Sequence, residues 1–155
     1  MKVSILDRWS RKIQQLRQRA FLEAAMAAAA LVSTADEDVR LSEQLALDRV
    51  LDRLDRLRVF DPHTGVELHR RYAESILADP SQGRLAAIQA LVSFDGSDEE
   101  RLLILYVAAV IAKADQVLSN LERGALDQIC QALSLPVEPS LERIWATTGS
   151  PERVE

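Results

Sequence analysis

The sequence predicts an all-α fold, a compact bundle of about eight helices built from two duplicated helix–acidic loop–helix units. Apolar residues recur at helical spacing along nearly the whole chain, and no stretch shows the alternation of a β-strand. Aromatic residues make up only 5% of the chain while Ala and Leu abound, which favours close packing of helices. The 155 residues, 48% of them hydrophobic, suffice for one domain with a sizeable core.

The first predicted helix, residues 3–20, is basic and amphipathic. Its apolar stripe consists of Leu6, Trp9, Ile13, Leu16 and Ala20. Residues 1–20 hold six Lys or Arg and one Asp, a charge of +5; since the whole chain carries −5, residues 21–155 carry −10. We expect the stripe to pack on the bundle, with the basic residues facing the acidic body. The alternative is peripheral association of residues 1–20 with an anionic inner membrane.

The next two helices supply much of the predicted core. Residues 21–33 are apolar on all sides apart from Glu23, which predicts a buried helix. A third helix, about 42–58, turns Leu47, Val50 and Leu51 inward and a row of alternating Asp and Arg toward solvent.

Asp-Pro pairs and capping boxes mark the starts of the later helices. The helices expected from these signals span residues 62–78, 80–94, 98–113 and 119–134, and a short last helix lies near 140–147. The chain therefore divides into a basic N-terminal helix (1–20), an all-helical domain (21–147) and a tail (148–155) that we expect to be disordered.

One pattern occurs twice, with an offset of 79 residues. Residues 29–48 align with residues 108–127, and eight of these twenty positions are identical. Each copy has an apolar helix, an Asp just beyond its end, and a Glu seven residues later in the first turn of the next helix. Two copies of one unit should pack against each other, and their acidic loops should then meet.

The paired loops predict a metal site with Asp36, Glu43, Asp115 and Glu122 as ligands. Carboxylate and carbonyl oxygens suit Ca²⁺, Mg²⁺ or Mn²⁺ better than Zn²⁺. An Asp beyond a helix C-terminus faces the negative end of the helix dipole, and Lys113 is expected to compensate for this in the second copy.

Structural roles are equally open for some of these residues. Glu122 forms a capping box with Ser119, and Asp36 and Asp115 can serve simply as loop formers. The repeated pair Asp48 and Asp127 is expected on solvated helix faces.

The doubled pattern Ala-Asp-x-x-(Val/Leu)-x-x-x-Glu after an apolar helix resembles the TerB-like family, which is linked to tellurite resistance. This family includes the N-terminal domain of a membrane-anchored DnaJ-like co-chaperone. The resemblance runs from about Ala20 to Leu135, although Glu37 and Gln116 stand where the family usually has glycine. It implies a duplicated all-helical bundle, divalent metal at the four carboxylates named above, and a non-enzymatic role in bacterial stress response.

Other classes of function find little support in the sequence. The acidic body argues against nucleic acid, and there is no phosphate-binding glycine loop or serine-nucleophile motif, so we do not expect an enzyme. The lone Cys130 fits a reducing, cytoplasmic setting and a place in the core, and His63 and His69 do not form a metal site. The alternative to the metal-binding function is a metal-free module that docks protein partners or a membrane surface.

Overall fold

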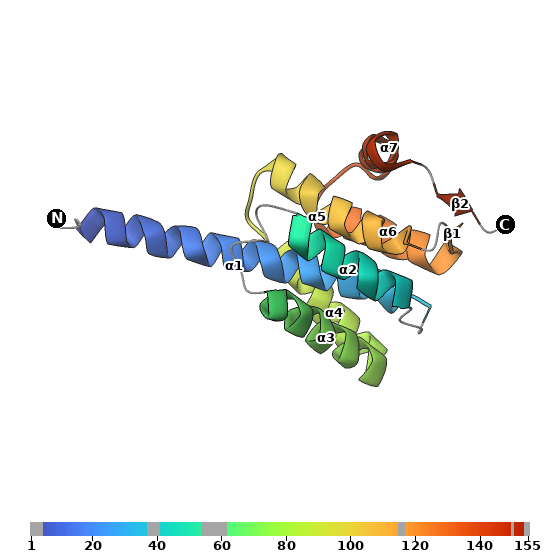
Figure 1. The fold of residues 1–155 in the computed structure, drawn as a ribbon, viewed down its shortest axis with the longest axis horizontal. Coiled ribbons are helices and arrows are strands. Elements are labelled where there is room, and N and C mark those ends of the chain that lie inside the picture. The colour runs from blue at the N-terminus through green and yellow to red at the C-terminus, as the bar shows by residue number, and fades with distance from the viewer. Residues whose placement is uncertain (1–4, 37–40, 54–61, 115–116, 150, 154–155) are drawn as a thin grey trace.

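The computed structural model describes residues 5–36, 41–53, 62–114, 117–149 and 151–153. Within these ranges the chain forms seven α-helices and one pair of very short strands (Figure 1). The elements are α1 (Ile5–Ser33), α2 (Leu41–Arg53), α3 (Pro62–Ala78), α4 (Pro80–Val92), α5 (Asp98–Ala112), β1 (Val117–Leu118), α6 (Asn120–Ala132), α7 (Val137–Thr148) and β2 (Glu152–Arg153). The all-α class is confirmed. No described helix is long and apolar enough to cross a membrane.

The described helices number seven rather than about eight because the first two predicted helices are one. Helix α1 runs through 29 residues without a break. The sequence changes from amphipathic to fully apolar at Phe21, but no Gly or Pro lies between residues 5 and 33 to end a helix there. Phe21 marks the point where α1 enters the core, and its ring packs edge-on against Phe94 at 6.2 Å.

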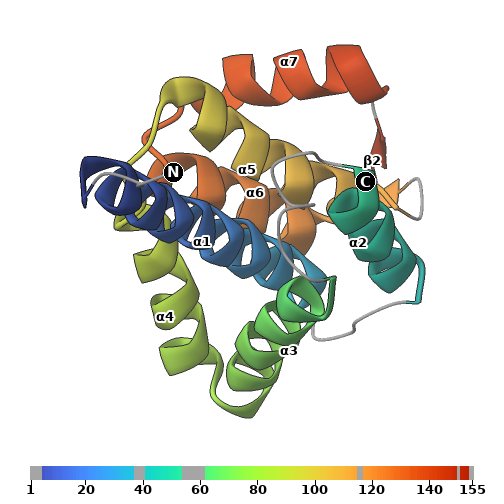
Figure 2. The ribbon, with the colours of Figure 1, turned by 60° about the vertical axis from the view of Figure 1, so that its left-hand side comes forward.

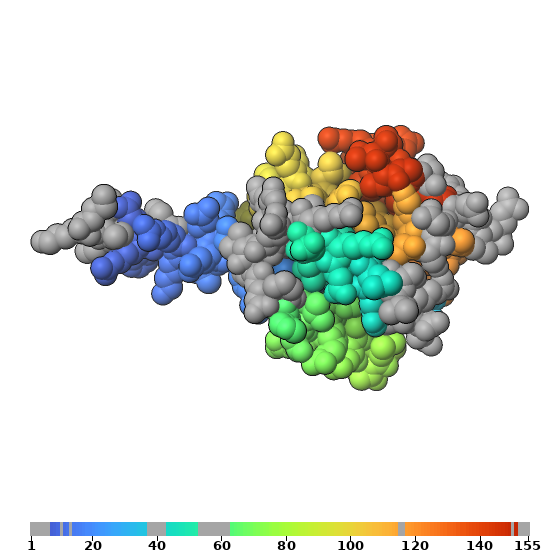
Figure 3. Space-filling view, in the orientation of Figure 1, coloured from blue at the N-terminus to red at the C-terminus, as the bar shows by residue number. Residues whose placement is uncertain are grey.

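The two halves of α1 have different surroundings. From Ala24 to Val32 every side chain is fully buried, because α1 contacts α3, α4, α5 and α6 on different sides. The N-terminal half instead projects from the body of the molecule (Figures 1 and 3). Trp9 is 65% exposed and Leu16 62%, so the prediction that this stripe packs on the bundle is wrong. An amphipathic pattern identifies an apolar face but not what covers it.

Helix α5 is the second central helix and packs against the buried half of α1. It begins at a capping box in which Ser97 and Glu100 satisfy each other's backbone N–H groups, as predicted. Its largest fully buried side chains are Ile104, Leu105 and Ile111. Helices α2, α6 and α7 pack around α5.

Helices α3 and α4 form an antiparallel hairpin against α1 (Figures 1 and 2). Asp79 caps α4 through the backbone N–H of Gln82, and Pro80 stands at its start, as the sequence predicts. The hairpin is tight at Gly83, where an added Cβ would lie 2.5 Å from the backbone of Ile76. Gly83 therefore sets how closely α4 approaches α3.

The C-terminal part differs from the prediction in two respects. Helix α7 begins at Val137 rather than near 140, because Pro139 lies in the first turn, where no backbone N–H is needed. Two residues expected in a disordered tail, Glu152 and Arg153, instead pair in parallel with Val117 and Leu118 (Figure 2). Strands of two residues are too short to leave a periodic signal in the sequence.

Candidate functional site at the acidic helix ends

Four helix ends that carry the repeated acidic pattern lie at one end of the molecule. These are the C-terminal ends of α1 and α5 and the N-terminal ends of α2 and α6, at the right in Figure 1. We call α1 and α2 the first acidic helix pair and α5 and α6 the second. Helix α1 contacts α6 and helix α2 contacts α5, so the two pairs pack against each other.

A cavity lies between the C-terminal end of α1 and the N-terminal end of α6. Thr34 and Ala35, just beyond α1, line this cavity of about 570 Å³ together with Asn120 and Leu121 of α6. Arg84 of α4 and Gln128 of α6 hydrogen-bond across its wall at 2.7 Å. The chain that leads to Asp36 therefore lies next to the first turn that holds Glu122.

Glu43 and Glu122 are buried at equivalent positions of the repeat. The exposed fraction is 2% for Glu43 and 1% for Glu122, and Oε2 of each is shielded from solvent. Both stand in the first turn of a helix, where the dipole favours a negative charge. A carboxylate shut away from water is costly unless hydrogen bonds, an opposite charge or a cation compensate it.

Glu122 also forms the predicted capping box. Its Oε1 accepts a hydrogen bond from the backbone N–H of Ser119 at 3.2 Å, and its own N–H donates to Ser119 Oγ at 3.1 Å. The capping role uses Oε1 and leaves Oε2 facing the protein interior. The structural interpretation of Glu122 is therefore confirmed, whereas its role as a metal ligand stays a prediction.

The other two predicted ligands are less defined. Asp36 is half-buried just beyond α1. Asp115 lies outside the described residues, as do Glu37 and Gln116, so the sharing of one cation by both loops stays a prediction. In the part of the chain that the structure describes, no three His, Cys, Asp or Glu side chains gather closely enough to hold a metal ion. The chemistry of the donors fits a divalent cation, since all the candidates supply oxygen.

A buried Ser33–His69 contact, which sequence reasoning missed, holds the end of α1 to α3. Ser33 Oγ donates to the carbonyl of Ala29 at 2.8 Å, so the His69 Nε2–H is the donor in its 3.2 Å contact with that oxygen. Burial lowers the pKa of His69 to about 4, which keeps the imidazole neutral. The two residues are 36 positions apart, and no local pattern links them.

Lys113 makes contacts that the sequence did not indicate, and its expected pairing with Asp115 lies outside the described residues. Its ammonium donates to the carbonyl oxygens of Thr148 and of Gly149, the latter at 3.1 Å. It thus satisfies the carbonyl end of α7, where a positive charge is favourable. Together with the β1–β2 pairing, this contact holds the C-terminal segment against the second acidic loop.

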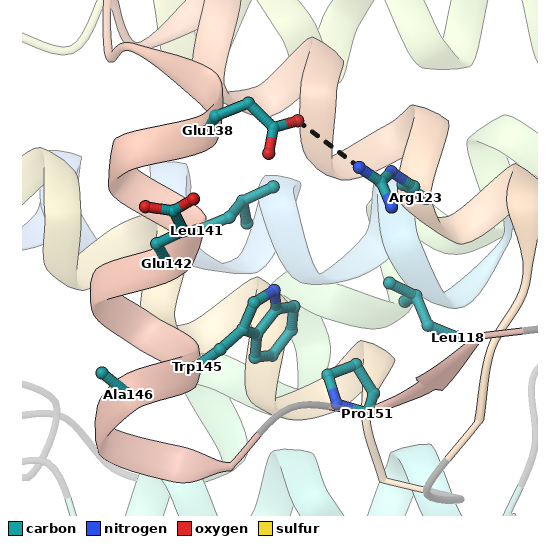
Figure 4. Close-up of a pocket in the computed structure, with 8 residues that line it drawn as sticks. All are labelled: Leu118, Arg123, Glu138, Leu141, Glu142, Trp145, Ala146 and Pro151. Carbon is teal, nitrogen blue, oxygen red and sulfur yellow. Dashed lines mark hydrogen bonds and ion pairs between the residues drawn. The ribbon is translucent and has the colours of Figure 1, made fainter.

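A second cavity, of about 360 Å³, lies under that C-terminal segment (Figure 4). Its apolar wall comes from Leu118, Trp145 and Pro151, and an ion pair of 3.4 Å joins Arg123 to Glu138 across it. The cavity could not be predicted, because it depends on where the tail lies.

The remaining sequence assignments have mixed outcomes. Asp48 is exposed, as expected, whereas Asp127 is half-buried with Oδ1 shielded from solvent. Cys130 is fully buried in the core, as predicted. Burial and the nearby Asp127 raise the pKa of the Cys130 thiol to about 12, so it stays protonated.

Comparison with known protein families gives a match over most of the chain. Residues 22–141 match the family described as tellurite resistance protein TerB. No curated protein and no solved structure matches the chain. The matched segment begins where α1 enters the core and includes both acidic helix pairs. Because it covers well over half of the sequence, the chain belongs to the TerB tellurite resistance family.

Proposed function

We propose that this TerB-family protein is non-enzymatic and binds a divalent cation through its acidic loops, acting in the bacterial response to tellurite and related stress. The observation that carries the proposal is the burial of Glu43 and Glu122 at equivalent helix starts at one end of the bundle. Family membership supports the tellurite link.

The ligands in this proposal are Asp36, Glu43, Asp115 and Glu122. Bound Ca²⁺, Mg²⁺ or Mn²⁺ would neutralise carboxylates that otherwise repel one another. The backbone N–H of Ser119 holds Oε1 of Glu122 at the start of α6, and Oε2 of the same carboxylate is shielded from solvent. Glu43 is as deeply buried at the start of α2.

Cation binding would act on the contact between the two helix pairs. The end of α1 lies beside the start of α6, so a cation that joins the loops stiffens the interface through which α1 meets α6 and α2 meets α5. A partner that binds only the stiffened form would then sense the cation. No catalytic step is needed for such a role.

The test measures melting temperature with Ca²⁺, Mg²⁺, Mn²⁺ or Zn²⁺ on the natural chain and on Glu43→Gln and Glu122→Gln. Glutamine at position 122 still completes the capping box, so the fold keeps that contact while the charge is lost. At saturating cation the natural chain should gain about 5–10 °C, and each variant should lose most of that gain.

Glu100→Gln is the matched control. Glu100 forms the same capping box with Ser97 at the start of α5, whereas Glu43 and Glu122 stand in the first turns of α2 and α6, which begin at the other end of the molecule. Its cation-dependent gain should equal that of the natural chain. If no cation raises the melting temperature, or if all three variants respond alike, the metal-binding function is wrong and the metal-free interaction module remains.

The tellurite role has a test of its own. Bacteria that depend on this protein for growth on tellurite should lose protection with Glu43→Gln/Glu122→Gln but keep it with Glu100→Gln, at equal protein levels. If the Glu43→Gln/Glu122→Gln variant protects as well as the natural chain, the tellurite role does not depend on cation binding at these glutamates.

A further inference from the structure

The projecting half of α1 presents an apolar stripe to solvent. Trp9 and Leu16 lie seven residues, or two helical turns, apart, which places them on one face. Both are more than three-fifths exposed, in a segment that extends away from the body (Figure 3). This segment precedes the part of the chain that matches the TerB family, so the family comparison does not account for it.

Basic side chains flank that stripe. At 100° per residue, Arg8, Lys12 and Arg19 lie along one side of the Trp9–Leu16 line and Arg17 lies along the other. From Asp7 to Ala20 the helix holds five Lys or Arg and one Asp. Long basic side chains beside an apolar face can lay their stems along it while their charges reach outward.

We propose that residues 5–20 of α1 form a docking surface for an anionic lipid bilayer. Indole rings favour the boundary between headgroups and acyl chains, and the flanking cations match anionic headgroups. The acidic body, at −10 over residues 21–155, is repelled by the same surface. A helix that projects ahead of the body lets the basic segment make contact while the body stays away.

A second copy of this chain fits the stripe less well. Two such helices side by side would bring Lys12, Arg17 and Arg19 of one copy toward the same residues of the other. Like charges beside the apolar seam of a helix pair oppose association. An anionic surface instead attracts these basic side chains.

The experiment is co-sedimentation of the full-length chain with vesicles of phosphatidylcholine, alone or mixed with phosphatidylglycerol, in the presence of EDTA. The chelator separates this surface from any cation site. The chain should bind the mixed vesicles only, and added salt should release it. Arg8→Glu/Lys12→Glu should weaken binding by about tenfold or more.

Arg49→Glu/Arg143→Glu is the matched control. It changes the net charge by the same amount at exposed positions on α2 and α7, and it should bind like the natural chain. A Trp145→Phe background leaves Trp9 as the single tryptophan, whose emission should shift to the blue on mixed vesicles.

Three results would overturn the proposal. These are equal binding to both kinds of vesicle, no binding to either, and equal losses in the two charge-reversal variants. If the natural chain does not bind vesicles but forms dimers, and if Trp9→Gln/Leu16→Gln dissociates those dimers, the stripe binds a second copy of the chain instead.

Discussion

The two acidic helix pairs share a sequence pattern but differ in the contacts that attach them to the rest of the fold. In the first pair, the end of α1 is tied to α3 by the buried contact of Ser33 with His69. In the second, the loop after α5 pairs with the C-terminal strand, and Lys113 binds the end of α7. Glu43 and Glu122 are nevertheless equally buried. Burial of the acidic position therefore does not depend on one particular set of supports.

The difference has a physical origin in the neighbours of each loop. Helix α3 follows the first pair and packs on α1 and α2, so a side chain from α3 can reach the end of α1. Helix α7 follows the second pair and packs on α5 and α6, and the segment after it returns to β1. The end of α1 is thus supported by the helix that follows the first pair, and β1 by the segment that follows α7.

The largest expected effect concerns the support of the first pair. Gly83→Ala would place a methyl group against the backbone of Ile76, force α3 and α4 apart and lower the free energy of unfolding by about 3 kcal/mol. Gly124→Ala, in α6 of the second pair, meets nothing within 4 Å and should raise stability slightly, by about 0.5–1 kcal/mol. Urea unfolding of both variants checks this. Equal changes in the free energy of unfolding for the two variants would show that Gly83 does not determine how closely α4 approaches α3.

The next effect is a pH dependence of stability that arises from His69, the residue that contacts the end of α1 in the first pair. The pKa of His69 is about 4 in the folded protein and 6.5 as its ordinary value, so the unfolded state takes up the proton first. The stability from neutral His69 is complete above pH 6.5 and is lost as the pH falls through 4. From pH 7 to pH 5 the natural chain should lose about 2 kcal/mol that His69→Gln does not lose. Parallel pH profiles of the two proteins would contradict this assignment.

The smallest effect tests the support of the second pair. Lys113→Met removes the cation from the carbonyl end of α7 and should cost about 1 kcal/mol. Limited proteolysis should then cut the segment after Thr148 faster than in the natural chain. Ser33→Ala, which alters the first pair only, should leave that cleavage rate unchanged. Equal cleavage in Lys113→Met and the natural chain would mean that β1–β2 pairing alone holds the tail.

Helix starts were predictable because their chemistry is local. Asp79, Ser97 and Ser119 each cap a helix through a residue three positions later, so a window of four residues contains the whole interaction. The continuity of α1 was missed for the converse reason. A change from amphipathic to apolar residues at Phe21 looks like a boundary, but it has no effect on the backbone hydrogen bonds of a helix.

The candidate site was predictable only in part. The repeat correctly placed Glu43 and Glu122 in the first turns of their helices. The resemblance to the TerB family, seen from about Ala20 to Leu135, is confirmed by the match over residues 22–141. The contacts of Lys113 and the Ser33–His69 contact were not foreseen. They join residues 35 and 36 positions apart, and no local spacing encodes such pairs.

The sequence by itself determined the all-α class, most helix starts and the family, because each depends on spacing within a few turns. Only the tertiary structure decided that the basic half of α1 stands clear of the core and that the C-terminal segment lies on the second loop. An apolar face reports that burial is favourable, but which surface provides that burial depends on how distant parts of the chain pack.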